Sequence, residues 1–313
     1  MAGGQERILR GRIRSVQATK KITRAMELIA ASRIVKAQAA VAAAVPYSEL
    51  ITEVVKHVSA AGANTDFPLL QGRDPVQTTC YVVIGADRGL CGGYNTGVQR
   101  SAEGEIKADV VAGKGYVVLP VGRKVEGYFT FRGYNMGRSF GGFTDSPKFE
   151  NAAEIGRHAV ELFLTGQVDR VELVYTRFIS PGNQEVVLRP LVPLVNMTGL
   201  ERTSDTPQAD YEYEPDPSTI LDVLLPRYVE ARVYAALLNA AASEHAFRQR
   251  AMKAATDNAD ELIKTLSRIM NRARQDAITT EIMEIVGGAE ALGADAETVA
   301  PLLELVDAMP GDD

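Results

Sequence analysis

Two glycine-rich segments contain the residue types that could bind a nucleotide. The segment GADRGLCGG (85–93) follows an apolar run that predicts a strand and precedes a predicted helix. Dinucleotide-binding loops have this position, but they need G-x-G-x-x-G spacing and an acidic residue at the end of a second strand. This sequence has neither, and GKG (113–115) lacks the upstream Gly and the Ser or Thr of a phosphate-binding loop. We therefore expect a packing role for the glycine turn with Cys91, and no nucleotide site.

The residues that most often bind metals or perform catalysis are few and scattered. His57, His158 and His245 have no partners at metal-ligand spacing. Cys80 and Cys91 are too few for a disulfide framework, which favours structural thiols in a reducing compartment. The sequence shows no Ser-His-Asp triad and no paired carboxylates that would indicate hydrolytic chemistry. We expect no catalytic site, no metal and no cofactor.

The composition is that of an ordinary packed domain with an acidic surplus. Of 313 residues, 46% are hydrophobic and 24% charged, and the formal net charge is −6. A nucleic-acid-binding protein usually has the opposite sign of charge. No signal or transit peptide is evident, and no stretch approaches 18 apolar residues, so we expect no membrane-spanning helix. Any association with a membrane is expected to depend on a partner.

Helix-forming residues at both ends flank a region of alternating strands and helices. Residues 1–61 predict one long helix, with Pro46 as a possible kink. Residues 75–194 predict the order β-α-β-α-α-β-β, with SPGNQ (180–184) as a hairpin loop. After a polar linker (195–217), residues 218–288 predict a second long helix that ends at Gly287-Gly288, followed by an acidic tail (289–313). The fold class is therefore α/β: a central Rossmann-like domain plus a long antiparallel coiled coil of the N- and C-terminal helices.

The lengths of the two terminal helices exclude their burial in a single globule. At 1.5 Å per residue they would reach roughly 80 and 100 Å, whereas a compact chain of this size has a radius of gyration of roughly 20 Å. Steps of three and four residues predict the contact seam of a coiled coil. In the C-terminal helix the seam comprises Ala231, Tyr234, Leu238, Ala241, His245, Arg248, Met252, Ala255, Ala259, Leu262, Leu266, Ile269 and Ala273. In the N-terminal helix it comprises Ile8, Gly11, Ser15, Ala18, Ile22, Ala25, Ile29 and Ser32.

Polar His245 and Arg248 indicate that the seam changes its partner along its length. Basic residues crowd the N-terminal helix, namely Arg7, Arg10, Arg12, Arg14, Lys20, Lys21, Arg24, Arg33 and Lys36. Such a helix could simply have a solvated face, or it could lie inside acidic surroundings. Heptad spacing alone would also allow a homodimer or a helical bundle.

Four stretches resemble the gamma subunit family of the bacterial F-type ATP synthase. They are RIRSVQATKKITRAMELIAASRIVKAQ (12–38), DRGLCGGYN (87–95), YEYEPDPSTILDVLLPRYV (211–229) and AMKAATDNADELIKTLSRIMNRARQDAITTEIMEIVGGA (251–289). The resemblance covers the chain from about Arg7 to Leu292. It implies a non-catalytic rotor stalk whose paired helices turn inside a ring of three alpha and three beta subunits, coupling proton flow to ATP synthesis or hydrolysis.

The resemblance also implies contact residues, partners and a location. Arg24 and Met26 match an N-terminal contact with beta-subunit hinge loops, and Tyr211, Glu212 and Tyr213 match a foot on the membrane c-ring. A second contact with the ring is matched by Arg248, Gln275, Thr279 and Glu281. The implied partners are the alpha, beta and epsilon subunits and the c-ring, at the cytoplasmic side of the cell membrane, with no nucleic acid.

Some positions depart from the family pattern, and two other functions stay open. Asp276 and Thr280 stand where the family pattern suggests other residues, and the tail after Leu292 has no counterpart in most members. One alternative is a basic coiled-coil scaffold or nucleic-acid-binding protein. The other is a Rossmann-type enzyme with helical appendages.

Overall fold

The computed structural model describes residues 2–61, 67–194, 213–214 and 216–291. The chain forms two compact units, one of Met1–Arg24 with Ala254–Asp313 and one of Ala25–Lys253. The elements are α1 (Ala2–Ala61), η1 (Pro68–Leu70), β1 (Thr78–Ile84), α2 (Tyr94–Val111), β2 (Gly115–Val121), α3 (Arg123–Arg132), α4 (Phe149–Leu164), β3 (Arg170–Phe178), β4 (Gln184–Val192) and α5 (Pro217–Ala291). The predicted order of strands and helices is confirmed.

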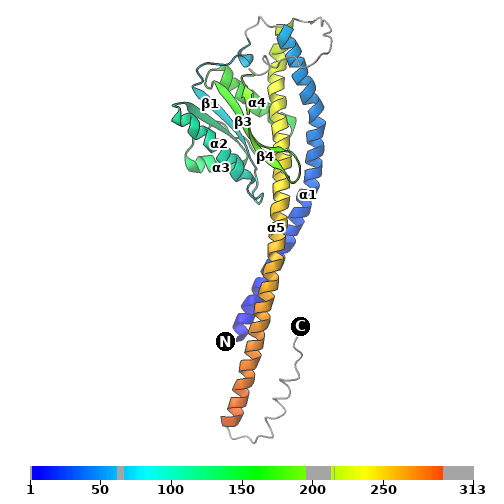
Figure 1. Ribbon diagram of the computed structural model, residues 1–313, viewed down its shortest axis with the longest axis vertical. Helices are drawn as coiled ribbons and strands as arrows, with labels where there is room; N and C mark the ends of the chain where they lie inside the picture. Colours follow the sequence, from blue (N-terminus) through cyan, green and yellow to red (C-terminus); the bar gives the residue numbers. More distant parts are fainter. Residues whose placement is uncertain (1, 62–66, 195–212, 215, 292–313) are drawn as a thin grey trace. The chain divides into compact units, whose positions relative to one another are not determined.

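A four-stranded sheet with the order β2-β1-β3-β4 forms the centre of the second unit (Figure 1). β1 is parallel to both β2 and β3, and β3 is antiparallel to β4. The β3–β4 connection is the predicted hairpin around 180–184. Strand β1 is buried along almost all of its length, which is why its sequence is a continuous apolar run rather than an alternating one.

Helices cover both faces of the sheet. On one face, Tyr81 and Val83 of β1 pack with Ile106 of α2 and Phe129 of α3. On the other face, Cys80, Val82 and Ile84 belong to a larger core that includes α4 and the parts of α1 and α5 within Ala25–Lys253. Figure 1 shows α2 and α3 on the face opposite α4. The result is an α/β sandwich in which α5 forms part of one layer.

In the first unit, α1 and α5 pair in antiparallel fashion. The hydroxyl groups of Thr23 and Thr256 lie 2.8 Å apart, and Lys20 forms an ion pair with Asp260. Moving forward along α1 therefore means moving backward along α5, as predicted.

The predicted seam of the N-terminal helix is wrong. Ile8 and Ile22 are each 61% exposed, whereas Leu9, Ile13 and Thr23 are buried. The true contact stripe starts one residue later, which is a rotation of about 100° around the helix. Period alone does not distinguish two neighbouring stripes that are both rich in apolar or small residues.

The seam of the C-terminal helix is confirmed in part. Ala231, Leu238, His245 and Met252 are buried, all within the second unit. In the first unit, Leu262 and Ile269 are 46% and 47% exposed, and Thr256 is buried in place of Ala255. Ala259 of the predicted seam is buried in the first unit, so only the alternate positions, Ala255, Leu262 and Ile269, are displaced by one residue there.

One boundary prediction needs correction. α5 continues through Gly287 and Gly288 to Ala291. α1 is one helix from Ala2 to Ala61 with Pro46 inside it, as predicted. α1 also contains, within Gln5–Ser59, a window long and apolar enough to cross a membrane by length and composition. Alanine raises the mean hydropathy of this window, and one such helix is weak evidence for a membrane span.

On the sheet face that α2 and α3 cover, the Glu103 carboxylate has three polar partners. The Tyr134 and Tyr128 hydroxyls donate hydrogen bonds to its carboxylate at 2.7 and 2.9 Å, and Lys107 lies 3.1 Å away. The hydrogen bond from Tyr134, followed by those from Lys107 and Tyr128, lowers the pKa of Glu103 to about 2.

We expect Glu103 to make stability depend on pH in the acid range. Its depressed pKa stabilises the fold above the ordinary carboxyl pKa of 4.5, and that contribution is lost as the pH falls toward 2. Glu103→Gln should therefore flatten the loss of stability between pH 5 and pH 3, as measured by urea unfolding. Glu185→Gln, which changes an exposed carboxylate, is the control. Parallel curves for the wild type and Glu103→Gln would contradict the expectation.

Candidate functional site

The glycine-rich loop 85–93 lies at the carboxyl ends of parallel strands β1 and β2, where doubly wound sheets bind their ligands. The Gly85 amide donates to the Val121 carbonyl at 2.8 Å, and the Gly122 amide donates to the Phe140 carbonyl at 2.7 Å. Gly122 has φ +101°, and a Cβ there would lie 2.7 Å from the Gly85 carbonyl oxygen. Glycine is required because two loop backbones meet here.

The Asp87 carboxylate fixes the start of this loop. It accepts hydrogen bonds from the amides of Gly142 (2.8 Å), Thr144 (3.0 Å) and Arg123 (3.2 Å), and from the Thr144 hydroxyl at 3.0 Å. Burial tends to raise the pKa of Asp87, but these hydrogen bonds outweigh burial and hold it below its usual range. Asp87 thus stays ionised and links three loops.

Side chains of α5 cover the other end of the loop. Arg248 Nη2 donates to the Gly89 carbonyl at 3.3 Å and to Glu244 Oε1 at 2.6 Å. The rings of Phe247 and Tyr94 lie 5.9 Å apart. Arg248 and Phe247 of α5 therefore lie where a Rossmann-type enzyme would bind its ligand. The predicted packing role of the glycine turn is confirmed by these contacts.

Buried titratable groups lie beneath this loop. Burial raises the pKa of Glu244, an effect that its ion pair with Arg248 opposes. Burial lowers the pKa of His245, whose Nε2 lies 3.0 Å from the Asp145 carbonyl oxygen. Burial raises the pKa of the Cys91 thiol, with Glu244 adding to the rise, so Cys91 stays a neutral thiol. His245 and Arg248 lie in the seam although they are polar, because this part of α5 faces loops of the α/β sandwich. Their polar atoms meet the backbone carbonyls of Asp145 and Gly89.

The predicted contact residues do not form one cluster. Arg24 is exposed on α1, and Met26 is half-buried. Gln275, Thr279 and Glu281 are exposed on α5, where the Thr279 hydroxyl donates to the Gln275 carbonyl at 3.0 Å. These three lie within two turns of one helix, whereas the Thr23–Thr256 pairing places Arg24 about twenty residues away from them along α5.

Arg248 is buried rather than exposed, because it is the partner of Glu244 and Gly89. Sequence reasoning missed Glu244, although its spacing of four residues from Arg248 on a helix could have indicated an ion pair. Tyr213 is half-buried and packs against the large core. Tyr211 and Glu212 lie outside the described residues.

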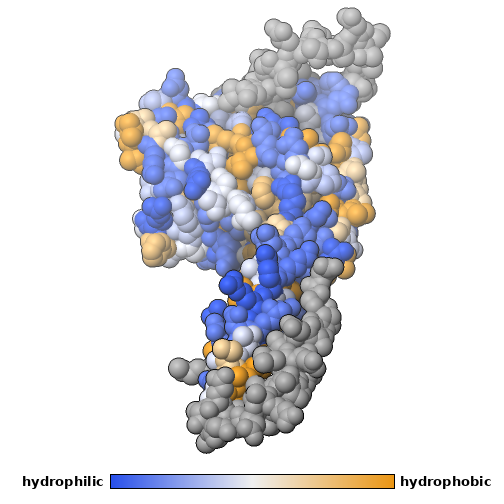
Figure 2. Space-filling model, turned by 60° about the horizontal axis from the view of Figure 1, so that its bottom comes forward, coloured by the Kyte–Doolittle hydropathy of each residue, from blue (hydrophilic) through white to orange (hydrophobic). Residues whose placement is uncertain are grey.

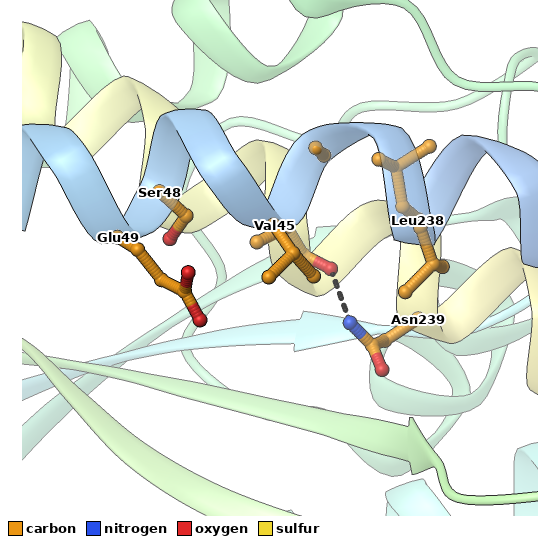
Figure 3. A pocket seen from close by; sticks show the side chains of 8 residues that line it. Val45, Ser48, Glu49, Leu238 and Asn239 are labelled. Atoms are coloured by element: carbon orange, nitrogen blue, oxygen red, sulfur yellow. Dashed lines mark hydrogen bonds between the residues drawn. The ribbon is translucent and has the colours of Figure 1, made fainter.

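A groove lies between α1 and α5 within the second unit (Figure 3). Its two adjoining parts, of about 220 and 390 Å³, share Ala44, Ser48 and Ala235. Small side chains on both helices leave this space, and the amide of Asn239 donates to the Ala235 carbonyl at 2.8 Å beside it. Glu49 is the one charged side chain among its lining residues, and the rest of the lining is mainly small or apolar.

No metal-binding cluster appears in the part of the chain that the structure describes. That part contains no group of three or more His, Cys, Asp or Glu side chains that could hold a metal ion. On the face seen in Figure 2, apolar residues form separate patches among hydrophilic ones rather than one continuous surface.

Comparisons with known proteins point to one family. A family model described as ATP synthase matches residues 5–292. The ATP synthase gamma chain of Mycolicibacterium gilvum (strain PYR-GCK) is 49% identical over 301 residues, covering 91% of this chain and 97% of that protein. The gamma chain of Frankia casuarinae is 50% identical over 295 residues, covering 93% and 99%. None of these relatives supports a nucleic-acid scaffold or a dinucleotide enzyme.

Solved structures show the same fold at lower sequence identity. A chain of the Euglena gracilis mitochondrial ATP synthase (OSCP/F1/c-ring) aligns with a TM-score of 0.65 at 16% identity, covering 93% of this chain and 96% of that one. A chain from the central stalk and c-ring of the Tetrahymena thermophila mitochondrial enzyme aligns with a TM-score of 0.57 at 23% identity, covering 75% and 99%. On the sequence relationships, supported by this fold, the chain belongs to the ATP synthase gamma chain family.

Proposed function

We propose that this chain is the central rotor stalk of an F-type ATP synthase. It turns inside a ring of three alpha and three beta subunits and couples proton flow to ATP synthesis or hydrolysis. The gamma chain is a non-catalytic subunit, so its task is to bias the nucleotide affinity of the sites around it. The observation that carries the proposal is the antiparallel pairing of the two terminal helices, Thr23 against Thr256, with apolar and cationic side chains left facing outward.

The outward surface of α1 supports a sliding contact. Ile8 and Ile22 are exposed, and Gly11, Ser15 and Ala18 alternate between them with small side chains. Exposed cations flank this stripe, namely Arg7, Arg10, Arg12, Arg14, Lys21 and Arg24. Small apolar contacts and charges that can exchange partners keep any one angular position from becoming a deep energy minimum.

The mechanism follows from the asymmetry of the helix pair. A shaft made of two different helices presents a different face to each beta subunit, and a partner shifts a conformational equilibrium only by contacting its states unequally. Each beta subunit thus has a different nucleotide affinity. As the shaft rotates, each beta subunit takes on the three affinities in turn.

The contact residues of the proposal are those that the family pattern indicates. Arg24 and Met26 contact beta-subunit hinge loops, and Gln275, Thr279 and Glu281 form the second contact with the ring. Arg248, which the family pattern also indicates, is buried and acts on the ring through the Gly89 turn that it holds. Tyr211, Glu212 and Tyr213 form the foot on the c-ring, and the epsilon subunit binds as a further partner. The chain thereby lies peripherally on the cytoplasmic side of the cell membrane, held there by the complex.

Reconstitution tests the assignment. The chain is mixed with purified alpha and beta subunits, and a one-to-six complex with ATPase activity is expected. If alpha and beta form the active ring and the chain does not join it, the rotor assignment is wrong.

Ile22→Asp is expected to weaken incorporation into that complex by about tenfold or more. Burying an isoleucine side chain contributes about 1.5–3 kcal/mol, and 1.4 kcal/mol corresponds to tenfold in affinity. Val111→Asp is the matched control, because Val111 is an 89% exposed side chain at the end of α2. The measurement is the amount of each variant recovered with the ring at limiting subunit concentration. Equal recovery of the two variants would contradict contact through this face.

A further inference from the structure

Leu90 occupies an unusual backbone conformation for its side chain. Its φ is +62°, the left-handed region that favours glycine and disfavours a branched apolar residue. It is also 62% exposed, so core packing does not explain why leucine stands there. A turn with a structural role only would be served better by Gly or Asn. Strain kept at an exposed apolar residue indicates a contact made outside the chain.

The turn that carries Leu90 is held from both sides. On one side, Arg248 Nη2 bonds the Gly89 carbonyl, which immediately precedes Leu90. On the other side, the Asn95 amide donates to Cys91 Sγ at 3.3 Å, while its Oδ1 accepts from the Ala86 amide at 2.9 Å. Gly92 lies beside α5, where a Cβ would make an ordinary contact at 3.6 Å from that of Ala251, and its φ of +55° is what favours glycine.

Glu244 determines where Arg248 points. It is 1% exposed, and its Oε1 lies 2.6 Å from the same Nη2 that reaches Gly89. One nitrogen thus joins a buried carboxylate to the carbonyl next to the strained residue. Because the N–H bonds of the planar guanidinium have fixed directions, two acceptors on one nitrogen restrict the orientation of the whole group.

We propose that Glu244 is a positioning residue that acts through Arg248 and Gly89 to present Leu90 as a fixed apolar contact to a subunit of the surrounding ring. The proposal rests on the rotor assignment and adds two residues to its contact machinery. Leu90 makes the contact, and Glu244 keeps it in place without touching the partner.

The first experiment separates strain from function. In Leu90→Gly the strain is relieved, so the melting temperature of the isolated chain is expected to stay level or rise by about 2–4 °C. The apolar side chain is lost, so proton pumping per ATP hydrolysed in the reconstituted enzyme is expected to fall at least about twofold. Leu90→Met, which keeps an apolar side chain, should retain most of the coupling. Phe131→Ser, at an 89% exposed position on α3, is the control for loss of exposed apolar area.

The second experiment tests the link to Glu244. Glu244→Gln should raise amide hydrogen exchange in residues 89–93 by about tenfold and lower coupling in the same direction as Leu90→Gly. Combined with Leu90→Gly it should cause little further loss of coupling, because both changes act on one contact. Normal coupling in Leu90→Gly would overturn the contact, and unchanged exchange in Glu244→Gln would overturn the positioning role. Failure of the wild-type chain to join the ring would instead overturn the rotor assignment.

Discussion

Replacing Arg248 by alanine is expected to lower the free energy of unfolding by about 3–5 kcal/mol, since it leaves a buried carboxylate without its partner. Arg248 is the ion-pair partner of Glu244, and both side chains are buried. The Gly89 carbonyl loses its hydrogen bond as well. Urea unfolding of the full chain, followed by circular dichroism, measures the change.

The loss of stability in Arg248→Ala is expected to become smaller as the pH falls. Burial already raises the pKa of Glu244, and removing Arg248 takes away the main opposing effect. Below that raised pKa the carboxyl is neutral, so the deficit of Arg248→Ala is expected to shrink between pH 7.5 and pH 5. Replacing both Glu244 and Arg248 by methionine should restore most of the stability, because no unpaired charge is left. A deficit that is independent of pH, or a double variant as unstable as the single one, would be inconsistent with an unpaired charge as the cause.

Gly122→Ala is the second change with a large expected effect, about 3–5 kcal/mol of destabilisation. Its φ of +101° is strained for any residue with a Cβ, and the added atom would lie 2.7 Å from a backbone oxygen that cannot move freely. The two loops that meet there also position Asp87 and the glycine turn, so incorporation into the ring should fall as well. The melting temperature and recovery with the ring are the measurements.

Gly104→Ala is the matched control for that change. Gly104 lies in the interior of α2, and nothing lies within 4 Å of an added Cβ. Alanine at this helical position should stabilise the chain by about 1 kcal/mol. If Gly104→Ala and Gly122→Ala had similar effects, the close approach of the two loops would not be the reason for glycine at 122.

The architecture could be predicted from the sequence because its signals are local. Long runs without glycine predict α1 and α5, and continuous apolar runs closed by glycine or proline predict β1 and β2. SPGNQ identifies the hairpin because turn residues interrupt two β-branched segments. The helix seam was misplaced on α1 because Ile8 and Leu9 are equally good core candidates, and only the partner's shape decides between them. Helix α5 continues past Gly287 and Gly288 because paired glycines weaken a helix without ending it.

The candidate site was less predictable because it depends on contacts that are distant in sequence. Nothing in the order of residues shows that Arg248 meets Gly89, 159 positions away. The positive φ of Leu90 is likewise invisible, since leucine is not a residue that signals a left-handed turn. Residues that follow a local pattern could be placed from the sequence, whereas residues held by distant partners could not.

The pairing of Thr23 with Thr256 also decides when the shaft can form during protein synthesis. The two residues are 233 positions apart, so the first helix leaves the ribosome long before its partner exists. At about 5–20 residues per second this interval lasts roughly 10–50 s. During it the cationic N-terminal segment has no helix to pack against, whereas the sandwich can already assemble its strands. Completion of the shaft therefore follows assembly of the strands and waits for the synthesis of α5.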